Sequence, residues 1–155
     1  MRIHLLAVGN RMPAWVSEGY QEYARRLPPE CHLQLVEIAP GARTKGADLA
    51  RSVRDEGERM LGAIPKDTLV IALDAHGVQW DTEKLSQQLE MWLGGGRDIT
   101  LLIGGPEGLA EDCLKRADQT WSLSKLTLPH PLARIVLAEQ IYRAWSILKK
   151  HPYHR

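Results

Sequence analysis

The chain has 155 residues, of which 44% are apolar and 25% are charged, and its formal net charge at pH 7 is +1. These values are typical of one globular domain with a core of its own, and no segment approaches the roughly 18 consecutive apolar residues that a membrane-spanning helix needs. A net charge near zero gives no overall attraction to a polyanion. We therefore predict a single domain over residues 1–155 and no membrane association.

Alternating apolar runs and helix-period segments fill the chain, which is typical of an α/β protein with a mostly parallel sheet and helices on its faces. Asp81 is a favourable N-cap for the third helix, and three glycines at 94–96 end it. We predict strands at residues 2–8, 32–38, 68–74, 99–103 and 120–123, and helices at 14–26, 48–63, 82–93, 109–117 and 132–150.

The N-terminus and the cysteines indicate the compartment. The opening MRIHLLAVGNRMP has an apolar stretch shorter than a signal-peptide core, with no small-residue cleavage pattern after it. Cys31 and Cys113 have no second Cys or His at metal-ligand spacing. We expect both cysteines to be reduced and structural, no bound metal, and a cytoplasmic protein.

Three predicted strands lead into unusual segments, which are LDAHG at 73–77, IGGPEG at 103–108 and LSKLTLPHP at 123–131. In an open parallel sheet, ligands bind outside the carboxyl ends of the strands. If the three strands are neighbours, the three segments converge on one ligand site.

The glycine-rich segment 103–108 does not suit a phosphate. Pro106 has no N–H to donate, Glu107 would repel an anion, and the Gly-Lys-Ser/Thr ending of a nucleotide-triphosphate loop is missing. Close backbone approach to a neutral or cationic ligand fits better. Glu107 has two interpretations, as a carboxylate that tolerates a cationic ligand or as a charge at the N-terminus of the next helix.

The segment 123–131 has neither strand alternation nor helix periodicity, although Leu126 and Leu128 are apolar. Its backbone N–H and C=O groups must find partners elsewhere. Either a ligand with hydrogen-bonding edges, such as a purine, or packing beneath another loop would supply them.

The last predicted helix has a narrow polar arc of Glu139, Gln140, Arg143 and Ser146, and is apolar elsewhere except at Arg134. One small domain rarely covers such a helix, so we expect a homodimer. Arg134 should meet an anion or a partner's carboxylate, because an unpaired buried guanidinium is costly. Glu139 and Arg143 either pair on the surface or belong to a site.

Two basic clusters also have two interpretations each. GARTKG at 41–46, with Arg51 and Arg54, is either a solvated face or an RNA contact, and KKHPYHR at 149–155 is either a disordered end or part of a site. Tyr153 could stack on a base.

The motifs MPAWV, LDAHG, LLIGGPEG, WSLSKLTLPHPLAR and YRAWSILKKHPYHR, in this order, closely resemble the bacterial ribosomal RNA large subunit methyltransferase H family, the smallest members of the SPOUT superfamily. The resemblance runs from Met1 to Arg155. It implies an S-adenosylmethionine (SAM) dependent homodimer with a C-terminal trefoil knot. It further implies methylation of N3 of a pseudouridine in the helix 69 loop of 23S ribosomal RNA, in the large subunit or the assembled ribosome.

Carried onto this sequence, the resemblance places SAM contacts at Leu73, at Gly104 with its neighbour Gly105, and at Leu123, Ser124, Lys125, Leu126, Thr127 and Leu128. Methyl transfer from SAM needs no metal, but N3 of the acceptor must lose a proton. We expect Tyr153, His154 and Arg155 to act on the acceptor side, followed by Arg134 and Arg143. Because the tail follows the expected dimer helix, we expect it to act in the partner's site.

Two other classes share parts of this pattern. A nucleotide-binding or flavin-binding α/β protein would have the glycine loop, but the lysine of a phosphate loop is absent. A non-catalytic ribosome-binding module would keep the basic tail and would not bind SAM.

Overall fold

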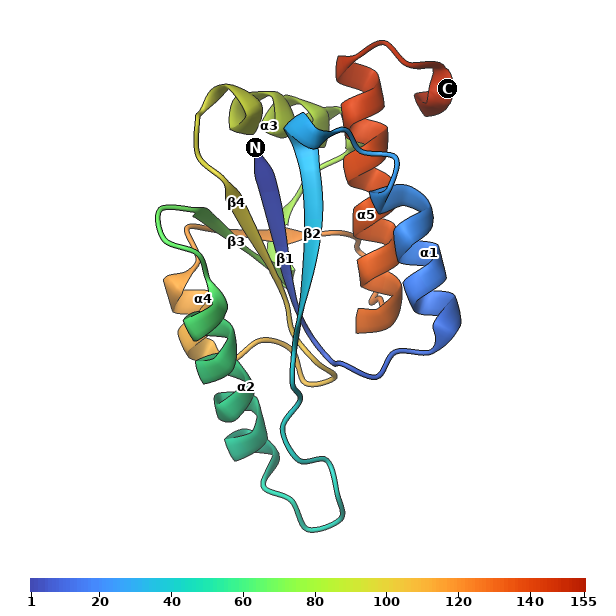
Figure 1. Cartoon of the computed structure of the whole chain (residues 1–155). Coiled ribbons are helices and arrows are strands. Elements are labelled where there is room, and N and C mark those ends of the chain that lie inside the picture. The colour runs from blue at the N-terminus through green and yellow to red at the C-terminus, as the bar shows by residue number, and fades with distance from the viewer.

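The computed structural model describes residues 1–155 and contains one five-stranded sheet with helices on both faces (Figure 1). The strand order is β2-β1-β4-β3-β5, and every neighbouring pair is parallel. The elements are β1 (Arg2–Val8), α1 (Ala14–Ala24), η1 (Pro29–Cys31), β2 (His32–Ile38), α2 (Leu49–Ala63), β3 (Leu69–Gln79), α3 (Thr82–Gly94), β4 (Ile99–Ile103), α4 (Glu111–Arg116), β5 (Gln119–Ser122), α5 (His130–Leu148) and η2 (Pro152–His154). The predicted fold class is confirmed, whereas the trefoil knot stays a prediction.

Local signals explain most element boundaries. Asp48 and Asp81 each accept a hydrogen bond from a backbone N–H in the first turn of the helix that follows, as N-caps do. The last helix begins at His130, two residues earlier than predicted, because Pro131 is compatible with a first helical turn. Strand β3 is longer than predicted, since it resumes pairing with β5 after a bulge between Leu73 and Val78.

Two apolar clusters fill the space on the two faces of the sheet. Alternation along β1 sends Ile3, Leu5 and Ala7 into the larger cluster and Leu6 and Val8 into the smaller one. The larger cluster is covered by α1, α3 and α5, and the smaller by α2 and α4. A sheet buried on both faces explains why its central strands are almost wholly apolar.

The long helix α5 lies between α1 and α3 and packs against both. Eight of its residues are buried, and Leu132, at 39% exposure, is its one exposed large apolar side chain. Ile135, Val136, Trp145, Ile147 and Leu148 are only half-buried, so the prediction that one domain does not fully cover this helix stays a prediction. The homodimer needs support from elsewhere.

Cys31 and Cys113 are buried and unbridged, as expected. Burial raises the pKa of the Cys31 thiol to about 11. No three His, Cys, Asp or Glu side chains gather in an arrangement that could hold a metal ion. No helix is both long and apolar enough to cross a bilayer.

Candidate functional site

The three segments singled out in the sequence belong to three neighbouring strands or to the loops that follow them. β3 pairs with β4 on one side and β5 on the other, and all three run parallel. The carboxyl ends of β4 and β5 therefore lie at one edge of the sheet, where residues 103–108 and 123–131 begin. Residues 73–77, in contrast, lie within β3, at the bulge between Leu73 and Val78. The expectation that these strands are neighbours is confirmed.

The glycines after β4 close their own loop. Gly108 N donates to Gly105 O at 3.0 Å, and Gly108 has a φ of +86°. A Cβ on Gly104 would lie 2.4 Å from the carbonyl carbon of Gly108, so no larger residue fits there. A Cβ on Gly105 would point toward Val8, at 3.2 Å from its Cγ1. Loop closure thus requires glycine at Gly104 and favours it at Gly108, whatever ligand lies beyond.

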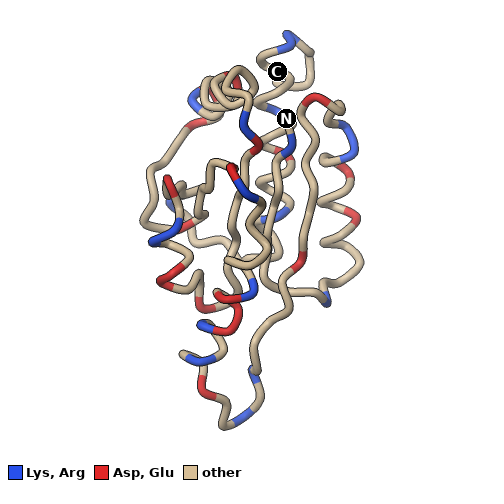
Figure 2. The backbone as a smooth tube through the Cα atoms, turned by 60° about the vertical axis from the view of Figure 1, so that its left-hand side comes forward, with Lys and Arg blue, Asp and Glu red and all other residues tan.

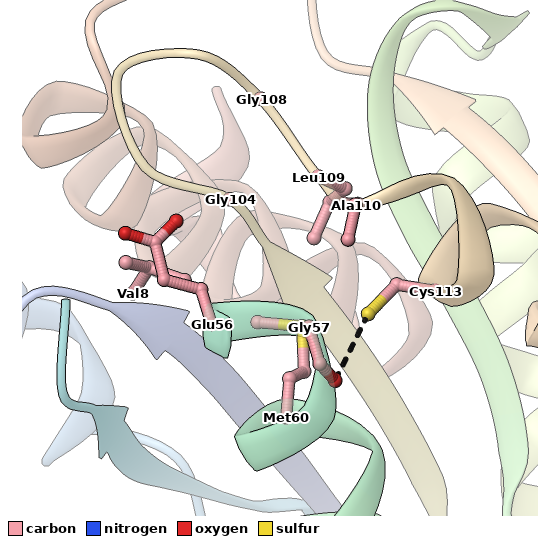
Figure 3. Close-up of a pocket in the computed structure, with 9 residues that line it drawn as sticks. All are labelled: Val8, Glu56, Gly57, Met60, Gly104, Gly108, Leu109, Ala110 and Cys113. Atoms are coloured by element: carbon pink, nitrogen blue, oxygen red, sulfur yellow. Dashed lines mark hydrogen bonds between the residues drawn. The ribbon is translucent and has the colours of Figure 1, made fainter. Parts of the chain in front are cut away.

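The far side of this loop packs against α2 (Figure 3). At Gly57, α2 approaches Ala110 so closely that a Cβ on residue 57 would lie 2.5 Å from Ala110 Cβ. Cys113 Sγ donates to Gly57 O at 3.6 Å. The crevice among the labelled residues leaves no room for a water molecule. A ligand therefore cannot enter between the loop and α2.

The Glu107 carboxylate forms an ion pair with Arg43, which is neither of the two roles expected for it. Arg43 Nε lies 2.9 Å from Glu107 Oε1, and Arg43 Nη2 lies 2.6 Å from Glu56 Oε2. Glu56 is 3% exposed and also accepts a hydrogen bond from Gly41 N at 2.8 Å. The interpretation of Glu107 as the N-terminal charge of the next helix is wrong, because α4 begins only at Glu111. Arg43 is likewise neither a solvated side chain nor free to bind a phosphate.

Few backbone groups of the loop 123–128 form hydrogen bonds within the chain. Two hydrogen bonds involve it, from Ser122 Oγ to Ser124 O at 3.0 Å and from Leu126 N to Ser124 Oγ at 2.9 Å. Leu126 is 76% exposed, and Leu73 on the neighbouring strand is half-buried. Free backbone donors and acceptors beside apolar side chains match the edges and faces of an adenine ring. The residues present therefore fit SAM.

The C-terminal residues fold back on the end of α5. The ring centroids of Tyr153 and Tyr142 are 4.7 Å apart, and the Arg143 guanidinium lies 5.0 Å from the Tyr153 centroid. Arg143 Nε also pairs with Glu139 Oε1 at 2.6 Å, which is the surface pairing considered above. Burial, followed by the charge of Glu139, raises the pKa of the Tyr153 hydroxyl. The tail is therefore ordered, with the Nδ1 atom of His154 buried and unpartnered.

The tail lies at the opposite end of the sheet from the three loops. α5 starts beside the loops and runs for 19 residues, which is about 28 Å of helix. Figure 1 places the C-terminus at the same end of the sheet as the N-terminus, the end at which β1 begins. Figure 2 shows Lys and Arg both near the C-terminus and on the segment before α2. Within one chain, the structure does not bring Arg143 and residues 153–155 together with residues 73, 104–105 and 123–128.

Arg134 is buried and is hydrogen-bonded to residues of its own chain. It is 2% exposed, and its Nη1 lies 2.7 Å from Glu37 Oε2 on β2. Its Nη2 donates to Gly9 O at 2.8 Å and to Val8 O at 3.3 Å. The expected carboxylate exists, but it belongs to the same chain and not to a partner.

A hollow of about 480 Å³ opens on the β1 side of the glycine loop. Four separate segments line it, and sequence reasoning missed it for that reason. The signal that could have found it is Asn10-Arg11, a polar pair directly after the first strand. The lining residues are Val8, Gly9, Asn10, Arg11, Met12, Ala39, Pro40, Arg43, Pro106 and His130.

The family model "Predicted SPOUT methyltransferase" matches residues 1–154. The chain belongs to the SPOUT methyltransferase family. It is 62% identical over 155 residues to a protein of Thioalkalivibrio sulfidiphilus named "Ribosomal RNA large subunit methyltransferase H", covering all of this chain and 99% of that protein. A protein of the same name from Methylococcus capsulatus is 55% identical, with full coverage of both. The resemblance seen in the sequence is thereby confirmed.

Among solved structures, a Legionella pneumophila protein with the cofactor SAM bound is similar in fold, with a TM-score of 0.51 and 13% identity. The match covers 93% of this chain and 66% of that one. At this identity the likeness concerns the SPOUT fold alone.

Proposed function

We propose that this SPOUT protein is a homodimer that transfers the methyl group of SAM to N3 of a pseudouridine in the helix 69 loop of 23S ribosomal RNA, in the 50S subunit or the assembled ribosome. The observation that carries the proposal is 62% identity over the whole chain with a protein named as a ribosomal RNA large subunit methyltransferase. The family membership supports the reaction type, and the resemblance of the motifs supports the nucleotide.

The cofactor end of the site consists of Leu73, the loop at Gly104 and Gly105, and residues 123–128. When bound, SAM supplies an electrophilic methyl group on a positively charged sulfur. The unpaired backbone groups of 123–128 would hold the adenine edge, and Leu73 and Leu126 its faces. The glycine loop would contribute backbone only, because no side chain fits at Gly104. The task of these residues is alignment of the methyl group with the acceptor.

The acceptor end of the site requires a second subunit. Tyr153, His154 and Arg155 combine an aromatic ring with titratable and cationic groups, which suit stacking on a base and stabilising the N3 anion. Within their own chain, the 19-residue helix α5, roughly 28 Å long, separates them from the loops. We therefore assign the tail to the partner's cofactor pocket, and this geometry supports the homodimer.

A mixing experiment tests the composite site. Leu126→Glu places a charge in the cofactor loop at an exposed position, and truncation after Pro152 removes the tail; each homodimer should be inactive. Random re-pairing should return about a quarter of wild-type activity, since half of the dimers are mixed and each mixed dimer has one intact site. No recovery, with mixed dimers confirmed by native mass spectrometry, would refute action across the dimer.

The central experiment incubates the protein with labelled SAM and ribosomes from a strain that lacks the modification, and then maps the methylated nucleotide. Label at N3 of a helix 69 pseudouridine is expected. Calorimetry with SAM, ATP and flavin separates the alternatives: SAM binding without methylation of any ribosomal particle contradicts the proposed reaction. Absence of SAM binding favours a ribosome-binding module, and preference for ATP or flavin favours a nucleotide-binding protein.

A further inference from the structure

The hollow beside the glycine loop lies at the topological switch point of the sheet. From β1 the chain crosses to β2 on one side, whereas β4 leads to β5 on the other, and β1 and β4 are neighbours. Ligands of open α/β sheets bind where connections diverge in this way, outside the carboxyl ends of the strands. The residues assigned to SAM lie on β3 and in the loops that follow β4 and β5, and so lie to one side of this point. Pro106 of the glycine loop lines the hollow, so the same loop borders the hollow and contains the predicted SAM contacts Gly104 and Gly105.

The hollow is the right size for a small ligand, and some of the polar side chains that line it have no hydrogen-bond partner. Its volume of about 480 Å³ lies in the range of roughly 300–1,000 Å³ found for ligand sites. Arg43 on its wall is fully engaged, by Glu56, Glu107 and the carbonyls of residues 41 and 42. Asn10, Arg11 and His130, in contrast, have no hydrogen-bond partner in the chain. These three groups are available for a ligand.

The free groups match a uracil-like ring with its phosphate. An imide edge presents an N–H between two carbonyl oxygens, and the Asn10 side chain can both donate and accept. The exposed Arg11 guanidinium suits a phosphate or a carbonyl oxygen. His130 is the first residue of α5 and directly follows the loop 123–128, so it stands between the hollow and the predicted SAM contacts.

The surroundings of His130 favour its neutral form. Burial, followed by the Arg134 charge on the same helix, lowers the pKa of His130, and the carboxylates of Glu56 on α2 and Glu107 on the glycine loop oppose this effect. Those two carboxylates are already paired with Arg43, and Arg11 adds a further positive charge on the wall. At neutral pH, His130 therefore has an unprotonated ring nitrogen that can accept a proton.

We propose that the hollow between β1 and β4 binds the acceptor nucleotide, with Arg11 and Asn10 contacting it and His130 accepting its N3 proton. This inference rests on the proposed function and assigns roles to residues that were not among the predicted site residues. N3 gives its proton to the free ring nitrogen of His130, and the electron pair left on N3 forms the new N–CH₃ bond. The pair of the broken S–CH₃ bond stays on sulfur, and His130 later releases the proton to water.

A variant that fills the hollow tests the binding part. Ala39→Trp places a large ring at an exposed position of the lining, and Ala50→Trp, exposed on α2 away from the hollow, is the matched control. Ala39→Trp should lower kcat/KM for ribosomes at least about tenfold, by the loss of contacts to one nucleotide, while the Kd for SAM and the melting temperature stay unchanged. Ala50→Trp should leave all three unchanged. Normal kcat/KM for Ala39→Trp, or a loss of dimer measured by light scattering, would overturn the assignment.

His130→Ala tests the proton acceptor. Wild-type kcat should level off above the pKa of His130, whereas the variant should lose about 100-fold or more and rise with pH throughout the alkaline range. Added imidazole should restore part of the rate, and calorimetry should give the same Kd for SAM. Identical pH profiles for both proteins, or no rescue by imidazole, would overturn the role of His130. Failure of the wild type to methylate ribosomes would instead refute the proposed function itself.

Discussion

Arg134→Met should destabilise the fold while leaving SAM affinity intact. The guanidinium is 2% exposed and donates to Gly9 O at 2.8 Å, to Val8 O at 3.3 Å and to Glu37 Oε2 at 2.7 Å. Methionine fills the space of the arginine stem but leaves the Gly9 carbonyl without this donor, which costs about 1–3 kcal/mol. Glu37 is one-third exposed and can be rehydrated, so its ion pair adds little.

The expected loss is about 2 kcal/mol of unfolding free energy, because the longer bond to Val8 contributes weakly and removal of a buried charge offsets part of the cost. For a chain of this length this corresponds to a fall in melting temperature of about 4–8 °C. Thermal unfolding followed by circular dichroism measures it, with the exposed Arg51→Met as the control that should not change. An unchanged melting temperature would refute the structural role of Arg134. If SAM binding were lost at the same time, Arg134 would belong to the cofactor site.

Two further predictions concern the loop and the tail. Gly104→Ala should lower the unfolding free energy, because its Cβ would lie 2.4 Å from backbone, whereas Gly62→Ala, with nothing within 4 Å of its Cβ, should be neutral or stabilising; equal melting temperatures for the two variants would contradict the loop-closure argument. Tyr153→Ala and His154→Ala should keep wild-type Kd values for SAM in calorimetry and lose methylation of ribosomes. Either variant methylating at the normal rate would remove the tail from the site.

The sequence by itself determined the local elements and the family. Periodicity of 2 or 3.6 depends on residues a few positions apart, so the strands and helices were predictable to within a few residues, the long β3 excepted. N-capping by Asp81 is equally local and is confirmed. The missing phosphate-loop lysine and the ordered motifs from MPAWV to HPYHR indicated the ligand class without any coordinates.

Tertiary structure alone decided which of these residues meet. Strand order depends on pairing between segments far apart in the chain, and no local pattern encodes it. The partner of Arg134 is 97 residues away and that of Glu107 is 64 residues away, so neither ion pair could be foreseen from spacing. The same non-local strand order creates the hollow between β1 and β4. The C-terminal tail lies at the opposite end of the sheet from the cofactor loops, because the 19-residue helix α5 runs the length of the sheet.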